Sequence, residues 1–471
     1  MPFQIVFLWS DLLLWLLVLC AIVLGIYSAH AAHLARAWER LGRNSIATGS
    51  ATLLCAFLLV GLADSLHYRE RLPPAPGAEA GQQDRIMYGV EVFSALDWLL
   101  TGLREGNEKT YSAPLATRLY AMESLETAAG TVRAYPRLIH GGARLADEGE
   151  RGGRIALRLA TGLACSELLF FDVGSHLVSA LARQGGISPR AARRSLWRNE
   201  TRFAWRGVLA AFAGLALVVL PMLFLCADFH ILGTDKAGQD VFYQALKSIR
   251  TALVIGLVTT LVMLPLAIML GIAAGYFRGW VDDLIQYLYT VINSIPGVLL
   301  IAAAVLMMQV VIDTHQEWFS TAAERADLRL VALCAILGMT SWTGLARLLR
   351  GEALKQRELE YIQAARAFGV SSLRIIVRHV LPNLMHIVII ALVMDFSALV
   401  LAEAVLSYVG IGVDPAMMSF GTMINNARME LSREPVVWWS LAAAFAFMFT
   451  LVLSANLFAD AVRDAFDPHG A

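Results

Sequence analysis

The stretch Tyr361-Ile-Gln-Ala-Ala-Arg-Ala-Phe-Gly369 is followed, after nine intervening residues, by His379-Val-Leu-Pro382. This polar, arginine-bearing segment lies between two strongly apolar runs. Helix-forming residues extend from Glu352 to Phe368 without glycine or proline, and Gly369 supplies the left-handed residue that ends a helix. The three residues after it can cap a second helix, which Pro382 would end. The segment from 352 to 382 therefore predicts two short helices at an angle to one another.

The composition is that of a membrane protein. Hydrophobic residues make up 58% of the chain and charged residues 16%, whereas about 25% of residues are charged in soluble proteins. Lys and Arg equal Asp and Glu at 38 each, so the overall charge gives no information about nucleic-acid or acidic partners. A nucleic-acid partner is not expected, because no aromatic stacking pattern accompanies the arginine-rich run 183–206. The five cysteines form no CxxC pair and no cluster with histidine, which disfavours a disulfide framework or a metal site.

Eight apolar runs are long enough to cross a lipid bilayer, whose hydrocarbon core is about 30 Å thick. Because lipid offers no hydrogen-bond partners to the backbone, each run is expected to be a helix. The fold class is therefore all-α, in a polytopic integral membrane protein. The runs are Ile5–Tyr27, Ile46–Leu66, Gly207–Ala227, Ala252–Tyr276, Leu284–Val311, Leu328–Leu349, Leu384–Val409 and Val436–Phe458.

Arginine placement predicts the orientation of the last six runs. Seven arginines between 183 and 206 indicate a cytoplasmic stretch by the positive-inside rule. Strict alternation then places Arg350–Arg378 in the cytoplasm and Gly410–Glu434 outside. The segment quoted above is thus expected on the cytoplasmic face, where a soluble partner can reach it.

Three segments follow from this pattern. Residues 1–66 form a two-span membrane segment, residues 67–206 a soluble insert that ends in the basic stretch, and residues 207–471 a six-span domain. The insert carries turn-forming residues, among them Pro73–Gly77 and Gly141-Gly142. The role of the N-terminal segment stays open.

Two topologies are possible for the insert, and they place it on opposite sides of the membrane. If the first two runs form a hairpin that begins inside, the insert is cytoplasmic and eight spans result. If the insert begins outside, Ile155–Ala182 must be a ninth span that carries Glu167 and Asp172. An acidic residue at the centre of a span costs about 2.5–3.5 kcal/mol on insertion scales, which mildly favours the hairpin.

The opening segment resembles a known family. The string Gln363-Ala-Ala-x-x-x-Gly369-x9-His379-x-Leu381-Pro382 is similar to the EAA motif of ABC importer permeases. In that family the motif forms the coupling helix, which docks in a cleft of the ATP-binding subunit. Gln363 stands where Glu is usual and His379 where Ile is usual, and both departures resemble the dipeptide/oligopeptide/nickel branch.

Further motifs follow in the order expected for that branch. The external element of that branch is similar to Leu232-Gly-Thr-Asp-x-x-Gly-x-Asp-Val241, with Gln239 where Arg is usual. Gly275–Asp282 resembles its first cytoplasmic turn, and Ala402–Gly410 and the tail Asp460–Pro468 also fit. The resemblance extends from Gly207 to Pro468. Tyr135-Pro136 followed by Gly141-Gly142 faintly resembles an external insert of microcin/oligopeptide-type permeases.

Candidate functional residues fall into three groups. The resemblance implies an ATPase-coupling group and an external motif, while ionisable or polar side chains within spans are candidates for the translocation path. Glu403 could instead brace the external segment, and Asp395 could bind a neighbouring helix. The coupling group is Gln363, Ala364, Ala365, Gly369, Arg374, His379, Leu381 and Pro382; the external motif is Gly233, Thr234, Asp235, Gly238 and Asp240; the path candidates are Asn293, Ser294, Asp395 and Glu403.

The histidines are not spaced as metal ligands. His230, His315 and His379 stand apart from other potential ligands in the sequence, so they are expected to act as isolated side chains. No catalytic constellation is recognisable either, and the sequence is not expected to be that of an enzyme.

The sequence contains no G-x-x-x-x-G-K-[ST] phosphate loop. ATP and Mg²⁺ are therefore expected on partner chains and no cofactor on this one. The resemblance implies a multi-pass permease subunit of the bacterial inner membrane that forms half of the path for short peptides or similar solutes. Its implied partners are a second homologous permease, two ABC ATPase subunits and an extracytoplasmic substrate-binding protein. The alternative is a secondary transporter or channel. The cargo stays open among dipeptides, oligopeptides, nickel complexes and peptide antibiotics.

Overall fold

The computed structural model describes residues 3–30, 32–72, 88–127, 130–319 and 321–466. The turn-forming stretch Pro73–Gly77, and Asp467 and Pro468 of the tail, lie outside these ranges. The chain forms two compact units, which are taken in turn below. The first unit comprises Met1–Val6, Ala35–Thr251 and Met418–Ala461, and the second comprises Phe7–Leu34, Ala252–Met417 and Val462–Ala471.

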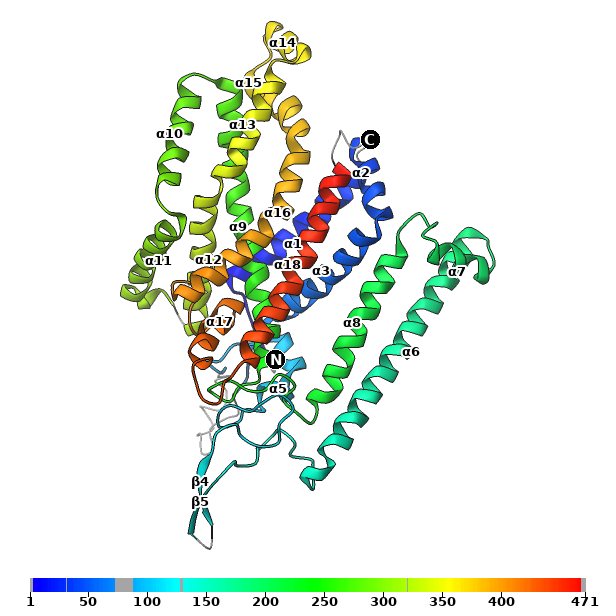
Figure 1. The fold of residues 1–471 in the computed structure, drawn as a ribbon. Coiled ribbons are helices and arrows are strands. Elements are labelled where there is room, and N and C mark those ends of the chain that lie inside the picture. The colour runs from blue at the N-terminus through cyan, green and yellow to red at the C-terminus, as the bar shows by residue number, and fades with distance from the viewer. Residues whose placement is uncertain (1–2, 31, 73–87, 128–129, 320, 467–471) are drawn as a thin grey trace, which may run out of the picture. The chain divides into compact units, whose positions relative to one another are not determined.

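Helices dominate the chain (Figure 1). Seven helical stretches within the described ranges are long and apolar enough to cross a membrane, which confirms the expected all-α polytopic class. These stretches are Ser45–Asp64, Trp205–Cys226, Val241–Phe277, Gly297–Thr314, Ala322–Arg357, Ser372–Val409 and Trp439–Phe466.

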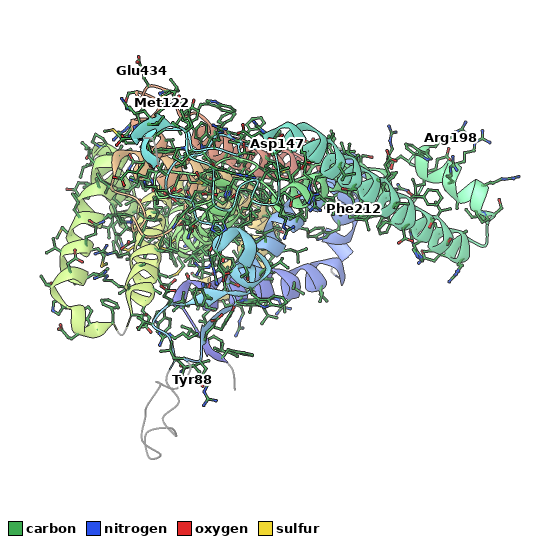
Figure 2. The ribbon with its side chains drawn as sticks, turned by 90° about the horizontal axis from the view of Figure 1, so that it is seen from below. Tyr88, Met122, Asp147, Arg198, Phe212 and Glu434 are labelled. Atoms are coloured by element: carbon green, nitrogen blue, oxygen red, sulfur yellow. The ribbon has the colours of Figure 1, made fainter. Side chains whose placement is uncertain are left out.

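The helical part of the first unit includes a long antiparallel pair, α6 and α8, joined by α7 (Figure 1). Figure 2 shows Arg198, after α7, at the far end of this pair from Asp147. Gly162 of α6 lies against Pro221 of α8, and the Ser166 hydroxyl donates to the Ala216 carbonyl over 2.8 Å. The elements are α2 (Ala32–Arg43), α3 (Ser45–Asp64), α6 (Arg151–Gly185), α7 (Pro189–Trp197), α8 (Trp205–Cys226), the first turns of α9 (Val241–Phe277), α17 (Phe420–Glu430) and most of α18 (Trp439–Phe466).

The rest of the first unit is the insert with the strand that precedes α1. Strands β1, β2 and β3 form a small antiparallel sheet in that order, and β4 pairs with β5 in a hairpin. Two short helices follow β3. The first of them, α4, begins at a capping box formed by Ser94 and Asp97. The elements are β1 (Phe3–Val6), β2 (His67–Glu70), β3 (Phe93–Ser94), α4 (Ala95–Leu99), α5 (Thr101–Arg104), β4 (Glu123–Thr127), β5 (Gly130–Ala134) and the 3-10 turn η1 (Glu148–Glu150).

A buried ionic cluster fixes the insert to the helices. The Lys247 ammonium of α9 lies 2.7 Å from Asp64 at the end of α3 and 2.9 Å from Asp97 of α4. The Ser94 hydroxyl also donates to Asp64 over 2.6 Å. A buried charge needs such partners, since an unpaired one would carry a large desolvation cost. Three segments far apart in the sequence are therefore joined at one point.

The helix of the first apolar run begins later than expected. Ile5–Tyr27 was predicted as one helix, but α1 begins only at Trp9. Phe3–Val6 instead pairs with His67–Glu70 of β2. The ladder with β2 pairs one row of their backbone groups, and the apolar content of a short run does not by itself distinguish a strand from a helix.

The second unit is a helix bundle that includes a hydrophobic core built from α9, α13, α14, α15 and α16. Leu349, Ile362, Ile375, Val380 and Leu384 are all buried in it. Gly271 and Gly275 let α9 approach the backbone of α13 closely, since an added methyl group would lie 2.7 Å and 2.6 Å from its carbonyl oxygens. The elements are α1 (Trp9–His30), most of α9, α10 (Trp280–Ser294), α11 (Gly297–Thr314), η2 (Gln316–Trp318), α12 (Ala322–Ser341), α13 (Thr343–Arg357), α14 (Glu360–Ala367), α15 (Ser372–Ile375), the π turn η3 (Ile376–Val380) and α16 (Leu381–Val409).

The expected single helix over Leu284–Val311 is two helices. The break lies at Ile295 and Pro296, where Ile295 is extended with ψ 132° and α11 begins at Gly297. Proline disfavours helical geometry in the residue before it and cannot donate a backbone hydrogen bond. These effects produce a complete break here rather than a kink.

Candidate functional site

The segment from 352 to 382 has a different helical pattern from the one expected. The predicted helix over Glu352–Phe368 is interrupted, because α13 ends at Arg357 and α14 begins at Glu360. Leu359 is extended between them, with ψ 139°. The Gln363 side chain donates to the Glu358 carbonyl over 3.1 Å, which satisfies a backbone group left free by the break. Burial of Ile362 in the core outweighs the helix propensity of this run.

The second half of the segment also departs from expectation. Pro382 does not end a helix; α15, the π turn and α16 run on continuously from Ser372 to Val409. The Leu381 N–H donates to the Ile376 carbonyl, five residues back. A π turn widens the helix just ahead of Pro382 and accommodates a residue that lacks an N–H. Gly369 ends α14 as expected, with φ 76°.

Helix α14 presents one face to the core and one to solvent. Ile362 is 1% exposed, and Ala365 packs against the same core. Gln363 and Ala364 are exposed, and Phe368 is 87% exposed. Ala364 and Ala365, adjacent in the expected docking group, therefore point in different directions.

The remaining coupling residues support α14 or extend its surface. The His379 ring packs edge-on to Tyr361 with centroids 6.0 Å apart, and Asn383 donates to the Tyr361 hydroxyl over 2.9 Å. Leu381 packs on the core, whereas Arg374 and Pro382 are exposed. Tyr361 thus ties α14 to the start of α16.

Phe368 is the residue of this surface that the sequence interpretation missed. Aromatic side chains are enriched at protein interfaces. The position of Phe368 in the polar segment, immediately before the predicted helix stop at Gly369, could have identified it as a large apolar side chain on an otherwise polar surface.

The external motif forms a loop that joins α8 to α9 and holds the insert. Gly233 and Gly238 have φ values of 70° and 77°. A methyl group on Gly238 would lie 1.8 Å from the Glu108 carbonyl oxygen, and one on Gly233 would lie 2.4 Å from that of Ser112. Only glycine permits the insert to approach this closely.

The polar residues of the motif have distinct structural roles. The Thr234 hydroxyl accepts from the Ser112 N–H over 2.7 Å and donates to the Thr110 carbonyl over 2.9 Å. Asp235 accepts from two backbone N–H groups of its own turn, each at 2.9 Å. Asp240 caps α9 by accepting from the Phe242 N–H over 2.8 Å. All the predicted external residues are thus brought together in one loop.

His230 is not isolated, contrary to expectation. Its Nδ1 lies 2.7 Å from Asp240 and its Nε2 lies 3.5 Å from Glu108, and all three side chains are buried. Glu108 also accepts from the backbone N–H groups of Ile139, His140 and Gly141. Sequence reasoning missed this group because Glu108 belongs to the insert.

The electrostatics of this group are those of a charged histidine between two carboxylates. Burial opposes a charge on His230, but hydrogen bonds and attraction to Asp240 and Glu108 raise its pKa to about 9. Burial would likewise raise the pKa of Glu108, yet its bonds with His230 and the backbone N–H groups lower it to about 2. Within the described residues no group of three potential ligands could hold a metal ion.

The four candidates for a translocation path do not form one cluster. Asn293 and Ser294 are exposed at the end of α10, and Asn293 accepts from the Thr343 hydroxyl over 3.3 Å. Asp395 is half-buried in α16. Glu403 is 2% exposed and accepts from the Ser407 hydroxyl one turn later, over 2.6 Å. This bond fits a bracing role for Glu403.

Comparison with known proteins identifies the family. Residues 267–469 match the family described as binding-protein-dependent transport system inner membrane component. The oligopeptide transport system permease protein OppC of Mycobacterium tuberculosis is 32% identical over 239 residues, which cover 51% of this chain and 76% of the relative. The glutathione transport system permease protein GsiD of Pectobacterium atrosepticum is 30% identical over 299 residues, with 58% and 92% covered.

A third relative, the dipeptide transport system permease protein DppC of Lactococcus lactis, is 28% identical and covers 52% of this chain. These relatives support the interpretation of the chain as a permease of an ABC importer and give no support to a secondary transporter or channel. The chain therefore belongs to the family of binding-protein-dependent transport system inner membrane components, the multi-pass permease subunits of ABC importers.

Proposed function

We propose that this permease imports short peptides and forms half of a transmembrane path with a second, homologous permease. The relatives named for oligopeptide and dipeptide transport support this cargo class. Two separate ATPase subunits, which bind ATP and Mg²⁺, would drive the cycle, and an extracytoplasmic binding protein would deliver the peptide. Asn293, Ser294 and Asp395 remain candidates for lining the path.

The observation that carries the proposal is the exposed face of α14. Gln363, Ala364 and Phe368 give it two small or polar positions beside one large aromatic ring. An aromatic side chain of this kind fits a pocket on a partner, and such residues commonly contribute most of an interface's binding energy. Arg374 follows α14 closely in the sequence and is also exposed. Its positive charge could pair with a carboxylate of the partner.

Motion would pass from this face into the membrane through fixed contacts. Ile362 and Ala365 fasten α14 to the core, and Tyr361 fastens it to Asn383. Arg357 donates to the Tyr276 carbonyl at the end of α9 over 2.9 Å. A displacement of α14 would therefore displace α9 and α16 together, and packed contacts of this kind can carry coupling between distant sites.

We also assign the insert to the extracytoplasmic side, with α6 as a ninth crossing. Arg158 and Asp228 meet at one end of the α6–α8 pair, and Ser166 meets Ala216 near its middle. Helix α6 is more polar than the seven apolar stretches, but its 35 residues are long enough for a crossing and pack along α8. Seven arginines join the two helices at the other end, and the positive-inside rule puts that end in the cytoplasm.

The decisive experiment replaces Phe368 with aspartate and measures retention of the ATPase subunits during purification, together with peptide uptake. Both should fall, because truncation of a central aromatic residue costs about 2 kcal/mol or more, roughly thirtyfold in affinity. Trp98→Ala is the matched control, since Trp98 is 72% exposed and lies on α4 of the insert. Normal ATPase retention and uptake in the Phe368→Asp variant would refute the docking role of α14.

A further inference from the structure

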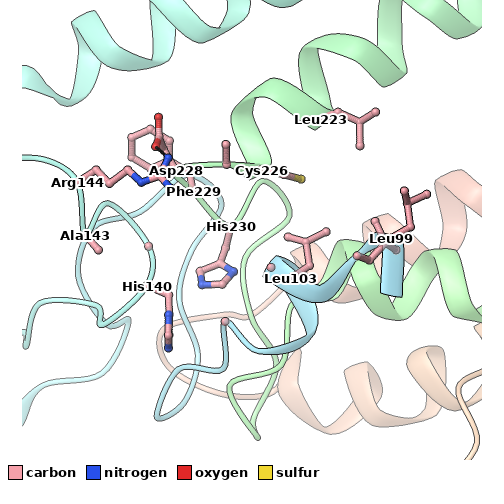
Figure 3. A pocket seen from close by; sticks show the side chains of 15 residues that line it. Leu99, Leu103, His140, Ala143, Arg144, Leu223, Cys226, Asp228, Phe229 and His230 are labelled. Atoms are coloured by element: carbon pink, nitrogen blue, oxygen red, sulfur yellow. Dashed lines mark hydrogen bonds and ion pairs between the residues drawn. The ribbon is translucent and has the colours of Figure 1, made fainter. Parts of the chain in front are cut away.

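A cavity of about 500 Å³ lies where the insert meets the end of α8. Its walls come from residues 99–106 of the insert, from the loop around His140 and Arg144, and from residues 223–230. Figure 3 shows Leu99, Leu103 and Leu223 on one side of this cavity, with Arg144, Asp228 and His140 on the other. One half is thus apolar and the other half polar.

The apolar half lies at the end of α8, a helix apolar enough to span a membrane. Leu223 is 44% exposed in the last turn of this helix. Trp98 and Leu99 of α4 are more than two-thirds exposed, and α4 is bound to the end of α3 through Lys247. Tryptophan and leucine at the end of spanning helices are typical of the membrane interface. This wall is therefore open to acyl chains.

The polar half carries more arginine than its carboxylate can neutralise. Asp228 is almost fully buried and contacts Arg158 at 2.7 Å, Arg154 at 3.1 Å and Arg144 at 3.3 Å. Arg144 makes the longest of these contacts, and its side chain is 65% exposed. When the buried group of His230, Glu108 and Asp240 is included, four cations still face three carboxylates. The cavity therefore favours an anion beside Arg144.

Two histidines also line the cavity near Arg144. His230 is 5% exposed, and its Nε2 lies 3.5 Å from Glu108, so an anion in the cavity would be held by Arg144 and not by His230. A phosphate oxygen that entered beside Arg144 and His140 would find a guanidinium and an imidazole on one side and leucines on the other.

We propose that this cavity binds an anionic phospholipid, with the phosphate at Arg144 and His140 and an acyl chain along Leu99, Leu103 and Leu223. Its volume is within the range of about 300–1,000 Å³ that is usual for small-molecule sites. Its two halves match the two parts of such a lipid, because the Arg144 guanidinium can pair with a phosphate and the leucines can contact an acyl chain. The proposal does not depend on the cargo or on the ATPase contacts, because it rests on the insert and α8 alone.

The test is native mass spectrometry of the full chain from nanodiscs that contain phosphatidylglycerol or phosphatidylcholine. Phosphatidylglycerol should remain bound in preference, and Arg144→Gln should lower its retention about fivefold. Arg118→Gln is the matched control, because Arg118 is a similarly exposed arginine of the insert that pairs with Glu148. Equal retention of both lipids, or equal loss in the two variants, would overturn the proposal.

A second measurement separates a lipid from a soluble phosphate. In detergent, short-chain phosphatidylglycerol should raise the thermal unfolding midpoint of the unmodified chain more than inorganic phosphate at the same concentration. Leu99→Gln should reduce that difference, since Leu99 is exposed and touches the proposed acyl chain. If inorganic phosphate alone gave the full, Arg144-dependent shift, the site would be one for a free anion and the lipid assignment would be wrong.

Discussion

Gly162 of α6 packs so closely on Pro221 of α8 that a methyl group on Gly162 would lie 2.5 Å from the proline Cα. Small residues commonly allow such contact between membrane helices. Gly162→Val should separate the pair and destabilise the chain by about 1–3 kcal/mol, measured as a lower thermal unfolding midpoint. Gly174→Val on the same helix meets nothing within 4 Å and should have little effect. Equal effects of the two variants would contradict this packing.

The assignment of the insert predicts a labelling pattern. In a variant without the native cysteines, Ser124→Cys and Glu150→Cys should react with a membrane-impermeant maleimide in spheroplasts, because both positions are exposed. Glu200→Cys, in the basic loop after α7, should react only after permeabilisation. The reverse pattern would place the insert in the cytoplasm and remove α6 from the list of crossings.

Alkaline pH should loosen the insert through His230. Its pKa is about 9 in the folded chain and about 6.5 in an unfolded one. A raised pKa means that protonation stabilises the folded state. This contribution, roughly 3 kcal/mol, is complete below pH 6.5 and is lost as the pH rises through 9. The two carboxylates that face His230, Glu108 and Asp240, then repel each other.

Limited proteolysis of the insert between pH 6.5 and pH 10 would measure this loss. Cleavage should accelerate across the interval in the unmodified chain, because Glu108 and Asp240 face a neutral imidazole at the upper end. In His230→Gln the rate should be raised already at pH 6.5 and should change little with pH. A variant with the pH dependence of the unmodified chain would show that another group is responsible.

Gly238→Ala should disrupt the junction between the insert and α9. The change forces an alanine into φ 77° and places a methyl group on the Glu108 carbonyl. Positive φ alone costs a non-glycine residue about 1–3 kcal/mol. Gly153→Ala, with open space around its site at the start of α6, is the control and should be neutral or slightly stabilising. Thermal unfolding of both variants in the same detergent compares them directly.

The pair of Arg350 and Asp282 joins α13 to α10 by two hydrogen bonds of 2.6 and 2.7 Å. Such forked pairs are stronger than single contacts. Arg350→Gln should lower the stability by about 1–3 kcal/mol, since it leaves a carboxylate without its partner. Lys355→Gln breaks only an exposed pair with Glu352 and should cost at most about 0.5 kcal/mol. Similar unfolding midpoints for the two variants would contradict this ranking.

Much of the membrane architecture follows from the sequence. Apolar runs such as Ile46–Leu66 and Gly207–Ala227 correspond closely to α3 and α8, because lipid leaves the backbone few alternatives. Gly369 was identified as a helix stop because few other residues adopt its φ. These features depend on local chemistry, which a single sequence carries.

The remainder depends on contacts between distant residues. The break at Leu359 serves the burial of Ile362, and the π turn before Pro382 keeps α16 continuous with α15. Neither can be read from propensities, which favour an unbroken first helix and a proline stop. The contact of Glu108 with His230 spans more than a hundred residues, so no local pattern predicts it. Periodicity alone did not reveal which of Ala364 and Ala365 faces outward.

The junction at Lys247 has a practical use. Because its ammonium holds Asp64 and Asp97 at once, the insert is joined to the first turns of α9 without a flexible linker. A tilt of those turns would therefore move the insert with them. On the proposed extracytoplasmic assignment, a fluorophore at Ser124 would report this movement to single-molecule measurements from outside the cell.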